Sequence, residues 1–155
     1  MDFRITGLPA KDFRHLFGLP EAELARLGAR RVVADASPGF PDRVELRDAD
    51  PGESLILVNF EHQAAPTPYR ASHAIFVLEN AGEAWDRRGE IPDVLARRTL
   101  SLRAFDAEGM MVGAELVEGC DLVAAIEALF ADPAALYIHV HYAKRGCYAA
   151  RIDRA

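Results

Sequence analysis

The stretch YIHVHYAKRGCY, residues 137–148, decides the fold of the C-terminal half, because it has the pattern of a β-hairpin. Gly146 can adopt the positive φ that a three-residue hairpin loop needs, which pairs His139 with Arg151 and His141 with Ala149. Since side chains alternate along a strand, this register predicts two faces. The apolar face comprises Ile138, Val140, Tyr142, Tyr148, Ala150 and Ile152, and the opposite face carries Tyr137, His139, His141, Cys147 and Arg151.

A second hairpin is predicted over Thr99–Val117, with its turn at DAEG, residues 106–109. Pairing Asp106 with Met110 puts six apolar side chains on one face, namely Leu100, Leu102, Ala104, Val112, Ala114 and Leu116. In this register Arg103 and Glu115 are diagonal neighbours and form a surface ion pair.

The segment between the hairpins, Cys120–Asp132, has helical periodicity and is followed by Pro133. Its apolar positions are Leu122, Val123, Ile126, Leu129 and Phe130. The order strand, strand, helix, strand, strand follows for the C-terminal half. We therefore predict an α+β fold in which a mostly antiparallel sheet carries this one main helix on its apolar face.

The N-terminal half predicts further strands at Phe3–Thr6, Ser54–Phe60 and 73–79, with a polar loop at Glu61–Ser72. At 155 residues the chain has the length of one domain, and no linker or repeat divides residues 1–155.

Composition restricts the partners. The chain has 24 acidic and 18 basic residues, for a net charge of −6, which argues against nucleic acid or an anionic membrane as the main partner. The first residues contain no apolar run long enough for a signal sequence or a membrane span. With only two cysteines there is no disulfide scaffold, and we expect a cytoplasmic protein.

The polar face of the C-terminal hairpin is the candidate site. His139 or His141 could act as a general base, Cys147 as a nucleophile and Arg151 as an anion clamp. The loop residues Tyr69 and Arg70 could form a lid that binds the carboxylate or phosphate of a small anionic ligand.

His139 and His141 could also bind one divalent metal ion, because alternate residues of a strand lie roughly 6.5–7 Å apart on one face. A metal site needs a third ligand. Cys147, His62, His73 or a carboxylate could supply it, but no local pattern selects one. The cofactor is therefore left open, and a site without metal, or a strand face whose histidines bond water, is favoured over a metal centre.

Two hypotheses for function follow. One is a small-molecule-binding protein or small enzyme with a His/Cys/Arg pocket on the C-terminal hairpin. The other is a non-catalytic interaction module, or a homo-oligomer, that uses the same sheet face. The pattern leaves open whether the protein is an enzyme.

Four segments in this order and spacing resemble a bacterial family catalogued as domain of unknown function 1203. They are PGFPDRVELRDADPGE, PYRASHAIFV, LSLRAFDAEGMMVGAELVEG and YIHVHYAKRGCYAARID, which together span most of the chain. The resemblance implies no particular activity, substrate or cofactor.

Overall fold

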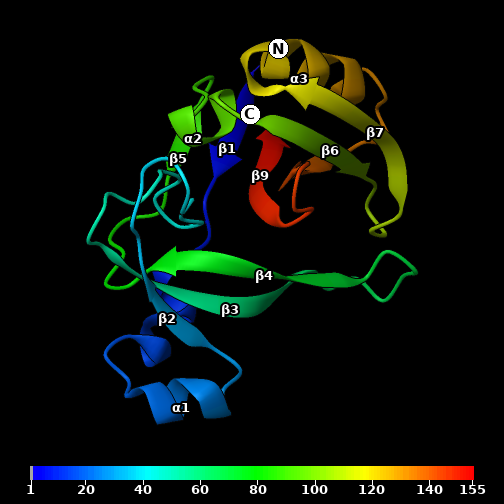
Figure 1. The fold of residues 1–155 in the computed structure, drawn as a ribbon. Coiled ribbons are helices and arrows are strands. Elements are labelled where there is room, and N and C mark those ends of the chain that lie inside the picture. The colour runs from blue at the N-terminus through cyan, green and yellow to red at the C-terminus, as the bar shows by residue number, and fades with distance from the viewer. Residues whose placement is uncertain (1) are drawn as a thin grey trace.

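The computed structural model describes residues 2–155 and folds them into two antiparallel sheets (Figure 1). The larger sheet has the strand order β5-β1-β9-β8-β6-β7, and the smaller one has the order β2-β3-β4. The strands are β1 Phe3–Thr6, β2 Arg30–Val33, β3 Ser54–Gln63, β4 Ala71–Leu78, β5 Asp86–Arg88, β6 Thr99–Phe105, β7 Met111–Glu118, β8 Tyr137–Tyr142 and β9 Tyr148–Arg154. The helices are α1 Glu21–Arg26, α2 Asp93–Ala96 and α3 Leu122–Phe130, with 3₁₀ turns η1 Ala10–Asp12, η2 Arg14–Leu16 and η3 Gly119–Asp121.

The C-terminal half has the predicted order β6-β7-α3-β8-β9, so the α+β class and the position of the main helix are confirmed. Helix α3 buries Leu122, Ile126, Leu129 and Phe130 in one core with the apolar residues of β6, β8 and β9. Val123 is instead 42% exposed, because the buried stripe of this short helix is narrower than its apolar composition suggests.

A second core lies under the smaller sheet. Ile75 and Val77 of β4 pack there with Leu24 of α1 and with Phe13 and Leu16 from the N-terminal turns. Strand β3 extends to Gln63 and strand β4 starts at Ala71, so the loop between them is shorter than the predicted 61–72 segment. His62, which was predicted in the loop, therefore belongs to β3, and His73 lies in β4 as predicted.

The turn of the β6–β7 hairpin is as predicted, with Gly109 at φ 83° and the Asp106 amide donating to the Met110 carbonyl. The register of the two strands differs from the prediction. Because Val112 is the extra residue of a bulge, Ala104 pairs with Gly113 and Arg103 with Ala114, which shifts β7 by one residue. Gly113 then faces α3, where Leu129 Cδ2 lies 3.1 Å from the position of an added Cβ. The predicted apolar residue Leu116 is left 69% exposed.

The C-terminal hairpin also contains a bulge. His139 pairs with Arg151 as predicted, but His141 pairs with Tyr148 and not with Ala149, which is the extra residue. The Tyr142 amide donates to the Cys147 carbonyl, so the turn is one residue longer than expected, although Gly146 has the expected positive φ of 78°. Tyr148 therefore joins the face of the histidines, and Cys147 leaves it.

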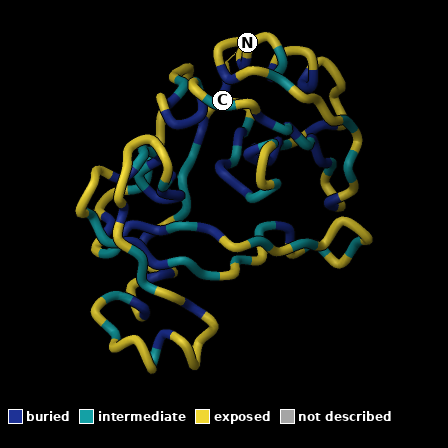
Figure 2. Tube along the Cα trace, in the orientation of Figure 1, coloured by how far each residue is buried: buried dark blue, intermediate teal, exposed yellow. Residues whose placement is uncertain are grey.

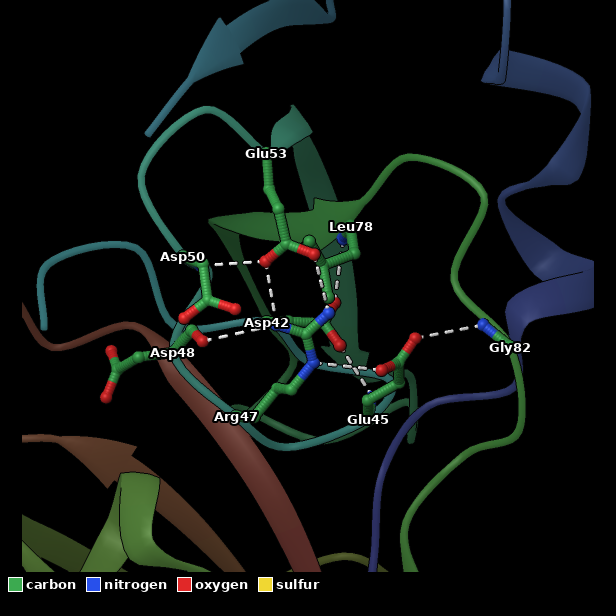
Figure 3. Close-up of polar contacts among 8 residues, drawn as sticks. All are labelled: Asp42, Glu45, Arg47, Asp48, Asp50, Glu53, Leu78 and Gly82. Carbon is green, nitrogen blue, oxygen red and sulfur yellow. Dashed lines mark hydrogen bonds and ion pairs between the residues drawn. The ribbon is translucent and has the colours of Figure 1, made fainter. Parts of the chain in front are cut away.

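The long connection between β2 and β3 is held by ion pairs around Arg47 (Figure 3). Its guanidinium contacts Glu45 at 3.0 Å and Glu53 at 2.7 Å. The buried Asp42 carboxylate accepts hydrogen bonds from the backbone amides of Leu78 and Glu45. These contacts fix the loop that carries Arg43 against β4 of the smaller sheet.

We expect Gly119→Ala to lower the free energy of unfolding by about 3 kcal/mol or more, because an added Cβ would collide with the backbone carbonyls of Leu95 and Ala96. Urea unfolding would measure the loss. Gly39→Ala is the matched control, since its nearest neighbour would be Ala36 O at 3.8 Å, and its stability should be close to that of the wild type. Equal stability of the two variants would contradict the close contact between η3 and α2.

Candidate functional site

The polar face of β8 is covered by the smaller sheet of the same chain. Figure 2 colours the chain by burial. Strand β8 is buried from Ile138 to Tyr142, and His139 and His141 are 4% and 0% exposed. The His62 ring lies 5.9 Å from the His139 ring and 4.8 Å from the His141 ring, measured between centroids. The histidine face is thus interior, and an interaction module could not use it without separating the two sheets.

His62, His73 and His141 form a cluster that we call the histidine triad. One ring nitrogen from each lies within 4.8 Å of those from the other two. His62 is the extra residue of a bulge in β3, since Glu61 pairs with Ser72 and Gln63 with Ala71. Bulges often redirect a side chain beside a functional site. Four of the five histidines of the chain lie in this region, and only His15 lies elsewhere.

Two buried ring nitrogens of the triad lack hydrogen-bond partners. His141 Nδ1 lies 2.9 Å from the Gly146 carbonyl oxygen and must donate to it, which leaves the lone pair on Nε2. This Nε2 is buried and has no hydrogen-bond partner. His62 Nε2 and His73 Nδ1 are 2.7 Å apart, while His62 Nδ1 is buried without a partner. A buried unsatisfied polar atom is costly, so such a group calls for an explanation.

All four imidazoles are held in their neutral form. Burial lowers the pKa of His139 and His141 to about 3 and that of His62 to about 4, and it also lowers the pKa of His73. The Arg103 guanidinium contributes in the same direction to the lowered pKa of each ring. Neutral imidazole is the form that binds metal ions.

Aromatic side chains enclose the cluster. Tyr148 stacks on His62 with a centroid distance of 5.4 Å, and Phe105 and Tyr137 lie 5.1 and 5.2 Å from the His139 ring. Arg103 opposes His139 across β6 and β8. The predicted ion pair of Arg103 with Glu115 is not formed, because the bulge in β7 places Glu115 opposite Leu102 on the other face.

Cys147 lies apart from the histidine face. Its Sγ accepts a hydrogen bond of 3.0 Å from Arg43 Nη2, and its side chain packs against the core between α3 and the larger sheet. The predicted diagonal contact with His141 fails because the turn is one residue longer. Cys147 and His73 nevertheless line one cavity of about 280 Å³, together with Arg43, Leu57, Ala74, Phe76 and Arg145.

The other predicted site residues lie around the edge of this region. Tyr69 contacts Phe105 edge to face at 6.3 Å, and Arg70 pairs with Glu61 at 3.2 Å on the exposed surface. Arg151 pairs with Asp153 at 2.7 Å and lies 4.1 Å from the centroid of Tyr137. The contacts of Arg70 and Arg151 do not include a residue of the histidine triad.

The loop that carries Tyr69 and Arg70 docks on the β6–β7 turn. Thr67 Oγ1 donates to the Gly109 carbonyl at 3.2 Å, and Gln63 Nε2 donates to the Tyr137 hydroxyl at 3.0 Å. These contacts hold the β3–β4 hairpin against the larger sheet and so hold His62 and His73 opposite β8.

Sequence reasoning placed His139 and His141 at the centre of the candidate site and named His62 and His73 only as alternatives for a third ligand. It missed Arg43, Arg103, Tyr142 and Tyr148. The concentration of histidine in two stretches, 62–73 and 139–141, is the one local signal that could have linked β3, β4 and β8.

A family model described as a protein of unknown function (DUF1203) matches residues 39–154, which include the whole histidine triad. No curated protein and no solved structure matches the chain. Across residues 2–155, none of the helices combines the length and the apolar composition that crossing a membrane requires.

Proposed function

We propose that this chain, which belongs to the DUF1203 family of proteins of unknown function, is a small-molecule-binding protein or small enzyme that works through a divalent metal ion. The ion would be held by His62, His73 and His141. The observation that carries the proposal is the convergence of three neutral imidazoles from three strands within 4.8 Å of one another.

The residues present fit such an ion. Three imidazole ligands suit zinc and related transition metals better than the hard ions Mg²⁺ or Ca²⁺, which take oxygen ligands. The bond from His141 Nδ1 to the Gly146 carbonyl is the outer-shell contact that usually orients a metal-binding histidine. Metal binding would also satisfy the buried, unpartnered Nε2 of His141.

Three protein ligands leave a coordination position for water or a ligand group. His73 lines the 280 Å³ cavity, which would give a small molecule access to that position. A bound zinc ion would supply Lewis acidity to whatever occupies the open position. Arg103, whose pKa is lowered by burial, adds positive charge beside the rings and favours an anionic group there.

The remaining features of the proposal concern location and partners. Cys120 and Cys147 are both free thiols, as a reducing compartment such as the bacterial cytoplasm would keep them. The net charge of −6 supports a small-molecule ligand over nucleic acid.

Zinc titration of protein stripped with a chelator tests the proposal. We expect one ion per chain, and at free Zn²⁺ of 100 times Kd we expect the free energy of unfolding to rise by about 2.7 kcal/mol. Substitution with Co²⁺ should give the visible absorption of a low-coordinate nitrogen site. A stripped protein that neither binds nor is stabilised by Zn²⁺ or Co²⁺ would overturn the metal site.

A further inference from the structure

Arg43 is a buried cation without a counter-ion. Its side chain is 1% exposed, and its hydrogen bonds go to the carbonyls of Tyr148 and Pro41 and to Cys147 Sγ. No carboxylate of the described chain forms an ion pair with it, whereas buried charges in proteins are normally paired. Two of its five N–H groups are left over after these three bonds.

The acidic residues nearby are already engaged. Asp42 accepts from the amides of Leu78 and Glu45, and Glu53 pairs with Arg47, as Figure 3 shows. Asp48 forms an ion pair of 2.6 Å with Arg98. The fold therefore neutralises Arg47 and Arg98 while it leaves Arg43 unneutralised.

Arg43 lines a second cavity, of about 300 Å³, together with Tyr142. Tyr142 is 6% exposed, and its buried hydroxyl has no hydrogen-bond partner. Two guanidiniums lie over its ring, with Arg43 Cζ at 5.0 Å and Arg98 Cζ at 5.2 Å from the centroid. Burial raises the pKa of Tyr142 to about 12, so the hydroxyl keeps its proton at neutral pH and is a donor.

The walls of this cavity combine positive charge with apolar surface. Arg43, Arg98, Lys144 and Arg145 supply the positive charge, Pro41 and Phe76 supply apolar surface, and no Asp or Glu lines the cavity. Lys144 and Arg145 are exposed and have no ion-pair partner among residues 2–155. In a protein with a net charge of −6, such a cavity attracts anions locally.

We propose that this cavity binds a small organic anion, whose acidic group accepts hydrogen bonds from Arg43 and the Tyr142 hydroxyl and whose apolar body packs against Phe76 and Pro41. The volume is at the lower limit of ligand pockets, roughly 300–1,000 Å³, which restricts the ligand to about the size of one ring with its acid group. A carboxylate and a phosphate have the same acceptor chemistry here, and both suit a guanidinium.

This site goes beyond the proposed metal centre and does not depend on it. The two cavities share Arg43, Phe76, Arg145 and Cys147, so a ligand anchored at Arg43 has His73 on the neighbouring wall. Binding at Arg43 needs no metal ion, and each site can therefore fail without the other.

Calorimetric titration of the metal-free and the zinc-loaded full chain with benzoate, phenyl phosphate, inorganic phosphate and the uncharged analogue benzamide tests the inference. We expect saturable binding of benzoate or phenyl phosphate and at least tenfold weaker binding of benzamide. Tighter binding of the phosphate compound would assign the natural ligand to the phosphate class, and tighter binding of benzoate would assign it to the carboxylates.

Tyr142→Phe is the informative variant, because it removes only the unpartnered hydroxyl and leaves the ring with both guanidiniums over it. We expect about tenfold weaker anion binding with a melting temperature equal to or above that of the wild type, whereas the surface variant His15→Ala should bind normally. Arg43→Met should abolish binding, with circular dichroism to verify its fold. Absence of binding for all three anions, or equal affinity in Tyr142→Phe, would overturn the inference whether or not zinc binds.

Discussion

His73→Ala should bind Zn²⁺ at least about a hundredfold more weakly than the wild-type chain. The expected loss is large because substitution of an outer-shell partner already costs roughly 10–100-fold in metal affinity, and His73 would be a direct ligand. His73 is half-buried on β4 and lies at a cavity wall, so the variant removes a ligand without opening a hole in either core. Competition with a chromophoric chelator would measure the affinity.

The chain supplies two matched controls for this experiment. His15 is exposed in the N-terminal turn η2, and His15→Ala should leave zinc affinity unchanged. His139 lies beside the triad but outside the set of converging nitrogens, so His139→Ala should affect affinity less than His73→Ala does. Equal affinity in His73→Ala and wild type, or an equal loss in His15→Ala, would contradict the assigned ligands.

The metal-free protein should lose at least about 4 kcal/mol of unfolding free energy between pH 7 and pH 5, because His139 and His141 account for about that much and the lowered pKa values of His62 and His73 add to it. Burial lowers the pKa of His139 and His141 to about 3, while in the unfolded chain both would titrate near the ordinary value of 6.5. The unfolded state thus binds more protons than the folded state below about pH 6.5, and stability falls as the pH falls. Each histidine contributes about 2 kcal/mol at pH 5 by this linkage.

Urea unfolding in a chelating buffer at the two pH values would measure this dependence. His139→Leu should remove about 2 kcal/mol of it, since one of the two most deeply buried imidazoles is then absent. Asp42, whose pKa is raised by burial, is unchanged in this variant, so the comparison isolates the imidazole. A stability that does not change between pH 7 and pH 5 would mean that the rings are hydrated or protonated in the folded protein.

The predictable part of the fold consists of elements with strong local patterns. Helix α3 and the turns at Gly109 and Gly146 follow from apolar periodicity and from the few residues that accept a positive φ. The strand registers were less predictable. The bulges at Val112 and Ala149 changed which residues share a face, and neither position carries a glycine or other local bulge signal.

In the candidate site, too, local spacing predicted some contacts and missed those that depend on strand register or on distant segments. That His139 and His141 share one face follows from their spacing on a strand, and it holds in the structure. The contact of Cys147 with this face depended on the register next to the turn, and the bulge at Ala149 replaced Cys147 with Tyr148. Arg43 could not be recognised at all, because an isolated arginine between Asp42 and Val44 in a proline-rich loop has the pattern of a solvated charge.

The sequence by itself determined the α+β class, the order β6-β7-α3-β8-β9, and the pairing of two histidines on one strand face. Each of these depends on residues close together in the chain, whose spacing sets the direction of their side chains. Only the tertiary structure decided that β3 and β4 cover this face and bring His62 and His73 to His141. The packing of one sheet on another depends on many weak contacts between distant segments, and no local spacing records them.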